Sequence, residues 1–537
     1  MQTLSQLPPV RPDTLRWAIF LAVLGPSAAL AQTGLEAASG PGGTPVIHNG
    51  HGVPVIDIVP PNATGLSHNQ FIDYNVATPG LVLNNATAAG QSQLAGALAA
   101  NPQFQGQAAS TILNEVVSRN ASLIEGPQEI FGRPADYILA NPNGITLNGG
   151  SFINTTRAGF VVGTPQFEEQ QLRYLDTLTA SGTLQVLEHG QGNAGGALEL
   201  IAPRVDSKGL LMASETLDIT VGRNRIDSRN GEVVEHLPSP SSSIDASLFG
   251  AMRAGRIRVV STAEGAGVRV GASQILGTEG VDISSAGGLH VSGSGDRPTE
   301  LRSELDKRDN LTRNTSDLRA ERIDLQSRGD TRIESATLDA GHIGGTIDGD
   351  LRIASLKDNV NTLSVKGDVR LSQEKNPQGY VNAAKSVAGP LGGKVETKAG
   401  SALSKADPGF SPTVSLDVSH AQRDNVARQT MLKSSDGIDL QVGGNAHLVG
   451  ARLQSAKGDV RLDANSVTQE TLSGNDYRRD LSLDASNSPV DLGTAIAEIA
   501  KSKMAADGEN ALDLGVLRTS GHSRSEQWVS SMQGKKH

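Results

Sequence analysis

The five residues Gly329-Asp330-Thr331-Arg332-Ile333 recur as Gly349-Asp350-Leu351-Arg352-Ile353, Gly367-Asp368-Val369-Arg370-Leu371 and Gly458-Asp459-Val460-Arg461-Leu462. The first three copies begin at residues 329, 349 and 367, so the repeat is close to 20 residues long. A Gly-Asp turn followed by alternating aliphatic and charged residues is typical of one circuit, or rung, of a β-solenoid. The aliphatic side chains are expected to point inward and the arginines outward. The repeat therefore predicts an all-β protein made of stacked rungs.

The composition fits an elongated repeat better than several ordinary globular domains. The chain has 537 residues, 61 glycines and only 3% aromatic residues, and it contains no cysteine. The lack of cysteine excludes disulfides, thiolate metal ligands and cysteine nucleophiles. A formal net charge of -10 argues against a nucleic-acid binder held by a basic surface.

The first 31 residues have the pattern of a secretory signal peptide. Arg11 and Arg16 precede a short apolar run at residues 17–24, and Ala29-Leu30-Ala31 has the small residues of a cleavage site. Cleavage is expected after Ala31. The apolar run is shorter than the roughly 20 residues that span a bilayer, so we do not expect it to act as a membrane anchor. The mature chain is expected to leave the cytoplasm.

Strand-like runs of β-branched and aliphatic residues continue from residue 34 to about residue 224, separated by Gly, Asn and Pro. Two stretches within it have helical character, at residues 91–100 and 109–117, and a third lies near the end of the chain, at residues 494–506. Polar, charged or proline-containing stretches predict loops, insertions or linkers at residues 226–243, 296–316 and 373–412.

Several blocks in the N-terminal third resemble the secretion domain of two-partner secretion exoproteins, the filamentous haemagglutinin and contact-dependent inhibition family. The blocks are residues 65–76, 80–85, 112–117, 140–146, 149–155 and 163–165. Their order and spacing agree along this part of the chain. The family's Asn-Pro-Asn-Leu motif reads Asn101-Pro102-Gln103-Phe104 here, and its second motif is Asn141-Pro142-Asn143-Gly144-Ile145. Many relatives carry a Cys-x-x-Cys pair where this chain has Leu147 and Gly150.

The resemblance implies a right-handed parallel β-helix with short capping and extra-helical β elements near the N-terminus. It also implies the secretion motif residues Asn101, Pro102, Asn141, Pro142, Asn143, Gly144 and Ile145. Physically, Pro sets the backbone for a turn, the Asn side chains can cap it, and Gly144 tolerates a positive φ. The motifs can thus act by closing a rung or by touching a transporter, and the residues alone leave both readings open.

The implied partner is an outer-membrane barrel transporter with periplasmic POTRA domains, to which an unfolded, strand-rich segment adds as a strand. The implied localisation is secreted or cell-surface associated, by Sec export and transit through the periplasm. The expected function is that of a non-enzymatic, filamentous haemagglutinin-like adhesin without a cofactor. Its remaining partner would be a host or bacterial cell-surface receptor or glycan, and no nucleic acid is expected.

These inferences predict six segments. Residues 1–31 are the signal peptide, 32–225 the secretion domain and 226–372 β-helical adhesin repeats. Residues 373–435 are an irregular or inserted segment, 436–493 a haemagglutinin-like repeat, and 494–537 a partly helical C-terminal segment.

Other functions remain open at this point. The chain could be the stalk of a contact-dependent growth inhibition protein without its toxin, a haemolysin-like cytolysin or, less favoured, a polysaccharide-active β-helix enzyme. His48, His51 and His68 lie near acidic residues in the sequence but lack the spacing of a metal site. The tripeptide Arg328-Gly329-Asp330 matches an integrin motif, but its register in the repeat is explained by a rung turn.

Overall fold

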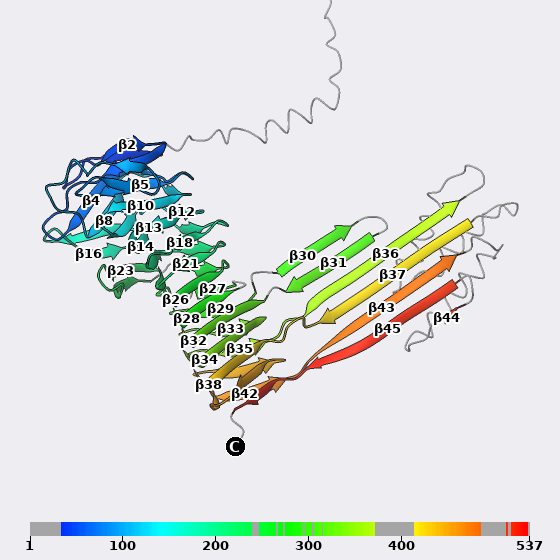
Figure 1. Ribbon diagram of the computed structural model, residues 1–537. Helices are drawn as coiled ribbons and strands as arrows, with labels where there is room; N and C mark the ends of the chain where they lie inside the picture. Colours follow the sequence, from blue (N-terminus) through cyan, green and yellow to red (C-terminus); the bar gives the residue numbers. More distant parts are fainter. Residues whose placement is uncertain are drawn as a thin grey trace, which may run out of the picture. The chain divides into compact units, whose positions relative to one another are not determined.

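The computed structural model describes residues 34–238, 246–264, 267–271, 274–293, 296–302, 306–313, 315–370, 413–484, 512–513 and 517–534. Every regular element among these residues is a β-strand, and the strands of the rungs form stacked parallel ladders (Figure 1). The fold class, a parallel β-helix, is therefore confirmed. No helix of the described residues could cross a membrane. The predicted signal peptide with Ala31, and the predicted helix at 494–506, lie outside the described residues.

Two compact units make up the chain. The first comprises the described residues up to Arg204 with Met212–Ser214 and Arg223–His236. The second comprises Val205–Leu211, Glu215–Gly222 and the described residues from Leu237 onward. Each unit is described by itself below.

Rungs of the first unit have three sides. One rung consists of β8 (Thr111–Val116), β9 (Ser122–Ile124) and β10 (Pro127–Gly132), and the next of β11 (Ala135–Ala140), β12 (Ile145–Leu147) and β13 (Ser151–Ile153). Equivalent strands pair in parallel, as in Tyr137 beside Ile112 and Ile145 beside Ser122. The same three sides continue through β4 (Leu66–Tyr74), β5 (Leu81–Asn85), β14 (Thr155–Val161), β17 (Leu184–Val186), β18 (Gln191–Asn193) and β19 (Ala197–Ala202).

The rung interior is built from every second residue of these strands. Leu139, Phe160 and Leu200 are in register on β11, β14 and β19, and all are fully buried. Because side chains alternate across a strand, the residues between them face outward. Stacking each rung on the one before therefore buries a continuous apolar column.

Additional strands cap and cover the first unit, as predicted. β1 (Leu35–Ala38) pairs antiparallel with β4 and caps the stack. Beyond the rungs lie a hairpin of β6 (Gly90–Ser92) and β7 (Gly96–Leu98) and a sheet of β15 (Thr164–Glu168), β16 (Gln171–Asp176), β23 (Arg223–Asp227) and β24 (Val233–Leu237). A second apolar cluster lies on the outer side of the rungs and includes Leu113, Val161, Leu175, Ile201 and Ile226.

The prediction of helices at residues 91–100 and 109–117 is wrong. The first stretch belongs mainly to the β6–β7 hairpin, and the second contains β8. β8 has rung strands on both sides, β4 and β11, and buries Ile112 and Leu113. Strand pairing therefore outweighs any local helix preference in both stretches, including the Ala-rich and Leu-rich residues 91–100.

Rungs of the second unit combine one long, bent strand with one short strand. The pairs are β26 (Met252–Ser261) with β27 (Gly267–Val270), β28 (Ile275–Ser285) with β29 (Gly288–Val291), β32 (Ser316–Ser327) with β33 (Thr331–Glu334), β34 (Ala336–Ile347) with β35 (Leu351–Ala354), and β38 (Met431–Val442) with β39 (Asn445–Val449). Before them stand β20 (Val205–Ser207), β22 (Thr216–Val221) and β25 (Ala246–Leu248), and after them β40 (Arg452–Ser455), β41 (Val460–Asp463), β42 (Ser466–Glu470) and β46 (Ser531–Gln533). One buried ladder runs through the long strands from Ile257 to Val281, Ile323, Ile343 and Ile438.

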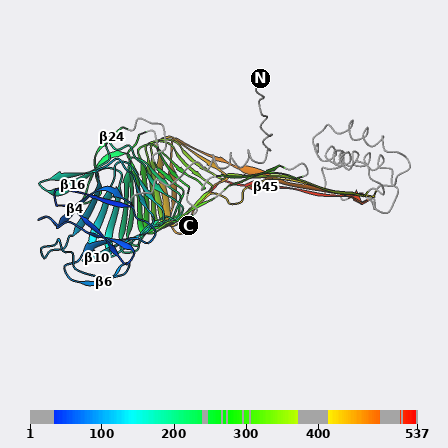
Figure 2. The same cartoon turned by 90° about the horizontal axis from the view of Figure 1, so that it is seen from above.

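A long antiparallel sheet is inserted between these rungs. Its strands are β30 (Asp296–Arg302), β31 (Asp306–Arg313), β36 (Asp358–Arg370), β37 (Thr413–Asn425), β43 (Leu472–Asp484), β45 (Leu517–Trp528) and β44 (Leu512–Asp513). Viewed edge-on, it is a single layer (Figure 2). Residues 296–302 and 306–313 are thus strands rather than a loop, and residues 413–425, which the sequence placed in an irregular segment, are a strand as well.

The Gly-Asp repeats do not all occupy the same place. The copies at 329 and 349 are neighbours on β33 and β35, where Ile333 pairs with Ile353 inside and Arg332 with Arg352 outside, as predicted. The prediction that the copy at 367 forms a rung is wrong, because this copy lies at the end of β36 in the antiparallel sheet. The copy at 458 starts β41, which pairs with the long strand β38 instead of a short one. Residues 445–449 supply the short strand that follows β35.

The aspartates of the two neighbouring copies link their turns. The Asp330 carboxylate accepts a hydrogen bond from the Asp350 backbone N–H at 2.9 Å, and the Asp350 carboxylate accepts one from the Asn445 N–H at 2.7 Å. The same hydrogen bond at both turns thus gives the Gly-Asp pair of Arg328-Gly329-Asp330 a structural reason that does not require integrin binding.

We expect Asp350→Ala to weaken the rung at Asn445 by about 1 kcal/mol, because one backbone donor loses a charged acceptor. Hydrogen exchange of the Asn445 amide should accelerate in the mature chain. Asp348→Ala is the matched control, since the described residues offer its carboxylate no hydrogen bond. Equal exchange rates in the two variants would contradict the turn-linking role.

Candidate functional site: two asparagine-proline turns

The second secretion motif closes the corner between β11 and β12. The buried Asn141 side chain uses Nδ2 to donate to the Asn120 carbonyl at 2.9 Å and to Ser122 Oγ at 3.0 Å. Its Oδ1 accepts from the Asn143 backbone N–H at 3.0 Å, which forms the turn over Pro142. Asn141 therefore joins its own turn to the preceding rung.

The rest of this motif completes the corner. Asn143 Nδ2 donates to the Ser118 carbonyl at 2.9 Å. Gly144 has a φ of 129°, a conformation that side chains with a Cβ rarely adopt. Ile145 is buried and begins β12 between Ser122 and Leu184.

The first secretion motif has the same design in a different place. Asn101 is also buried, and its Nδ2 donates to the carbonyls of Ile58 and Asn84, both at 2.9 Å. Its Oδ1 accepts from the Gln103 N–H at 2.9 Å, over Pro102. The Gln103 side chain in turn donates to the Asp57 carbonyl at 2.7 Å. Glutamine in place of the family's asparagine thus still ties the turn to a neighbouring strand.

The two turns share no hydrogen-bond partner among the described residues, so the structure does not bring the motifs into one site. Both asparagine side chains are occupied by their own chain in the folded unit. The residues that hold them, such as Asn84, Asn120 and Ser122, are scattered in sequence and carry no motif of their own. The sequence therefore located the turns but missed their partners.

The positions of the family's cysteine pair are filled by packing. Leu147 is fully buried at the end of β12. At Gly150, a Cβ would lie 2.0 Å from Gln191 Oε1, so the side chain of Gln191 takes the space beside it. The rung closes here without a disulfide.

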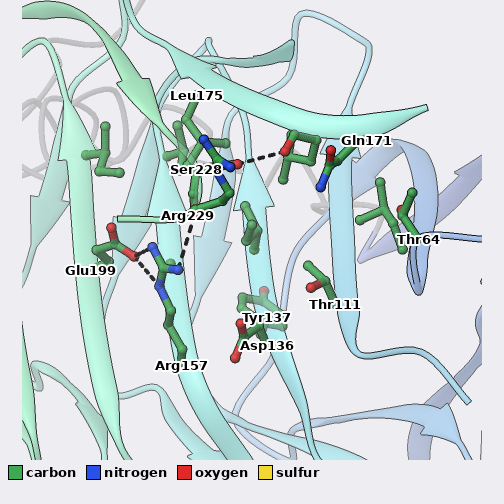
Figure 3. A pocket seen from close by; sticks show the side chains of 16 residues that line it. Thr64, Thr111, Asp136, Tyr137, Arg157, Gln171, Leu175, Glu199, Ser228 and Arg229 are labelled. Atoms are coloured by element: carbon green, nitrogen blue, oxygen red, sulfur yellow. Dashed lines mark hydrogen bonds and ion pairs between the residues drawn. The ribbon is translucent and has the colours of Figure 1, made fainter. Parts of the chain in front are cut away.

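A cavity of about 320 Å³ lies between the rungs, the outer strand β16 and the turn that follows β23 in the first unit (Figure 3). Arg157 crosses it and forms an ion pair with Glu199 at 2.6 Å, and it donates to the Ser228 carbonyl at 3.3 Å. The lining residues come from many segments, so no local sequence pattern indicates the cavity. Its central arginine joins the outer strand to the rungs.

Three histidines that lie close together in the sequence have separate partners. His48 pairs with Asp57 at 3.0 Å, His68 with Glu115 at 2.6 Å, and His51 Nδ1 contacts the Ala95 carbonyl at 2.7 Å. Within the described ranges, no three His, Asp or Glu side chains are placed to hold a metal ion together.

A buried polar chain lies inside the first unit. The Tyr74 hydroxyl donates to Gln128 Oε1 at 2.7 Å, and the Tyr137 hydroxyl donates to that of Tyr74 at 3.3 Å. Burial raises the pKa of both tyrosines well above the ordinary value, so both stay protonated. They act as fixed hydrogen-bond donors within the core.

The rungs and their outer strands define the class of protein as a parallel β-helix. Two family models match this chain. Residues 31–291 match the TPS secretion domain, and residues 260–366 match the hemagglutinin repeat. The chain belongs to the two-partner secretion exoproteins, the family that the sequence motifs indicated. The family's secretion domain implies a transporter partner in the outer membrane.

Curated relatives extend the likeness. The chain is 48% identical to a hemolysin of Proteus mirabilis over 255 residues, which are 48% of this chain and 16% of the relative. It is 33% identical to a tRNA nuclease CdiA of Yersinia mollaretii over 385 residues, which are 70% of this chain and 12% of the relative. The chain thus spans less than a fifth of each relative's length.

Among solved structures, the secretion domain of filamentous hemagglutinin is similar, at 27% identity and a TM-score of 0.46. The alignment covers 60% of this chain and 97% of that one.

Proposed function

We propose that this chain is a non-enzymatic adhesin exported through an outer-membrane barrel with periplasmic POTRA domains. The TPS secretion domain match over residues 31–291 carries the proposal. The remaining rungs form a stalk whose outer side chains repeat from rung to rung, an arrangement suited to multivalent attachment. The matched regions are a secretion domain and a repeat, neither of them catalytic.

The rung architecture suggests how export proceeds. Before folding, rung strands such as β8 and β11 have free backbone donors and acceptors that can add to a POTRA domain as an extra strand. Once the first rung has formed outside, each following rung buries apolar side chains on it, as Leu139 and Phe160 do on successive strands. Folding on the outside thus favours outward movement of the chain.

The hydrogen bonds of Asn101 and Asn141 support a role for the two secretion motifs in this folding step. In the folded unit both side chains already bind their own backbone. Direct contact with the transporter would therefore involve the unfolded segment.

Adhesion is tested with beads coated with the purified mature chain. We expect the beads to attach to epithelial cells or to agglutinate erythrocytes several-fold more than beads coated with an unrelated exported protein. Attachment at the control level with all cell types and erythrocytes would contradict the adhesin proposal.

Two other functions of the family are favoured by specific observations. The 385-residue similarity to a CdiA protein extends beyond the secretion domain and favours the stalk of a contact-dependent growth inhibition protein. The 48% identity to a hemolysin favours a cytolysin. Release of haemoglobin by the soluble mature chain would support the cytolysin, and intact erythrocytes would exclude it.

A further inference from the structure

A strand pair on the outside of the first unit covers an apolar face of the rungs. It consists of β23, β24 and the turn between them, residues 223–236, hereafter the clasp. Ile226 of the clasp is fully buried in the outer apolar cluster. The same cluster contains Leu113, Val161 and Ile201 of the rung strands β8, β14 and β19. The clasp therefore shields apolar side chains of three rungs.

Little apolar surface holds the clasp in place. Of its apolar side chains, all of which the structure describes, Ile226 is fully buried, Val233 is half-buried and Val234 is 54% exposed. Rung strands, by contrast, bury apolar side chains at every second position, as Leu139 and Phe160 show. A segment with few buried apolar contacts opens at a lower free energy than the core that it covers.

Strand pairing also sets the clasp apart from the rungs. β23 and β24 belong to a four-stranded sheet with β15 and β16, and among the described residues this sheet shares no strand with the rung ladders. The antiparallel pairing of β16 with β23 runs from Tyr174 opposite Asp227 to Asp176 opposite Arg225. Lifting the clasp therefore breaks no hydrogen bond of a rung ladder.

Polar contacts attach the clasp as well. The Ser228 N–H donates to the Arg173 carbonyl of β16 at 3.1 Å. Arg225 forms an ion pair with Asp176 at 3.0 Å. Figure 3 shows Arg157 reaching the clasp from the rung strand β14, where it donates to the Ser228 carbonyl at 3.3 Å. Ser228 and Arg225 are only partly buried, so water can replace these bonds when the clasp lifts.

Packing beneath the clasp is incomplete. Leu172 of β16 and Ser228 and Arg229 of the clasp all line the cavity of about 320 Å³. Side chains that border a cavity lack van der Waals contacts on that side. The clasp therefore gains less from packing than a rung gains from stacking on its neighbour.

We propose that the clasp is a lid that opens and closes on the folded rungs as a separate unit and controls access to the outer apolar face. In the closed state Ile226 fills its place in the apolar cluster, and β16 is paired on both edges, by β15 and β23. In the open state one edge of β16 is unpaired, and the part of the apolar face that Ile226 covers meets water. The inference goes beyond the adhesin proposal and does not depend on it.

Hydrogen exchange of the mature chain tests whether the clasp opens separately. The Ser228 amide bonds to β16, whereas the Val162 amide donates to the Ile201 carbonyl of a neighbouring rung strand at 2.8 Å. After correction for intrinsic rates, we expect the Ser228 amide to exchange about 100-fold faster or more than the Val162 amide, because only the clasp has to open. Equal corrected rates would overturn the proposal.

A single thiol tests whether the buried position of the clasp becomes accessible. The chain contains no cysteine, so a maleimide labels only an introduced one. Three variants are compared: Ile226→Cys, Val186→Cys, which is fully buried on the rung strand β17, and Val234→Cys, which is exposed on the clasp. We expect Ile226→Cys to react about tenfold or more faster than Val186→Cys, and about tenfold or more slower than Val234→Cys. A rate equal to that of Val186→Cys means that the clasp does not open separately, and a rate equal to that of Val234→Cys means that it does not close. Either result would overturn the proposal.

A disulfide across the strand pair tests the lid by locking it. Asp176 and Arg225 are directly opposite on β16 and β23, a position in which two cysteines can form a disulfide. In the double variant Asp176→Cys with Arg225→Cys, oxidation should slow exchange of the Ser228 amide about tenfold or more and lower the binding of an apolar dye. Exchange of the Val162 amide should stay the same. The reduced form of the same protein is the matched control. Equal exchange of the Ser228 amide in the oxidised and reduced forms, or equal slowing of the Val162 amide, would overturn the proposal.

Discussion

Replacing Asn141 by alanine is expected to destabilise the first unit by about 3 kcal/mol, because three groups lose their hydrogen-bond partner in a buried corner. The Asn120 carbonyl and Ser122 Oγ lose a donor, and the Asn143 N–H loses its acceptor. Asn141 is fully buried, so water cannot replace these bonds without opening the rung. The effect is large because one amide holds both the turn and the preceding rung.

Hydrogen exchange of the mature chain measures this effect locally, which suits a stack of rungs that need not unfold in one step. Amides of residues 143–147 should exchange about 100-fold faster in the variant, the factor that corresponds to roughly 3 kcal/mol. Asn230→Ala is the matched control, since this asparagine accepts a similar turn bond from Glu232 but is exposed. If Asn141→Ala has no more effect than the control, the motif is not a structural corner.

Local sequence patterns predicted those rungs whose residues repeat without interruption. Thr331 to Ile333 and Leu351 to Ile353 alternate inside and outside as expected, because adjacent copies of the repeat form adjacent strands. The copy at 367 has the same pattern, yet it lies in an antiparallel sheet. Alternation specifies a strand but does not determine which strand it pairs with, and here the partner, β37, begins at Thr413, far along the chain from the end of β36 at Arg370.

The two turns were also predictable, whereas their surroundings were not. Pro142 and Gly144 restrict their own backbone, so the residues alone indicate a turn. What Asn141 binds depends on which rung precedes it, and Asn120 and Ser122 are ordinary polar residues until the chain has folded.

Deleting residues 32–165 is expected to stop export almost completely. The deleted part contains both secretion motifs and the first rungs, which are the proposed starting point for transporter binding and for folding outside the cell. The predicted signal peptide is kept, so the shortened chain should still cross the inner membrane and then remain in the periplasm. A chain that has no initial rung gains no stacking free energy to favour outward movement.

The most direct test compares export of three chains in cells that also make a POTRA-containing outer-membrane partner. These are the full chain, the chain lacking residues 32–165, and a matched chain lacking residues 315–448, a deletion of the same length within the second unit. The amounts in periplasm and medium are measured by immunoblot with a C-terminal tag. We predict that the full chain and the matched deletion reach the medium, while the chain without residues 32–165 is found only in the periplasm. Export of that chain at the level of the full chain would contradict the account.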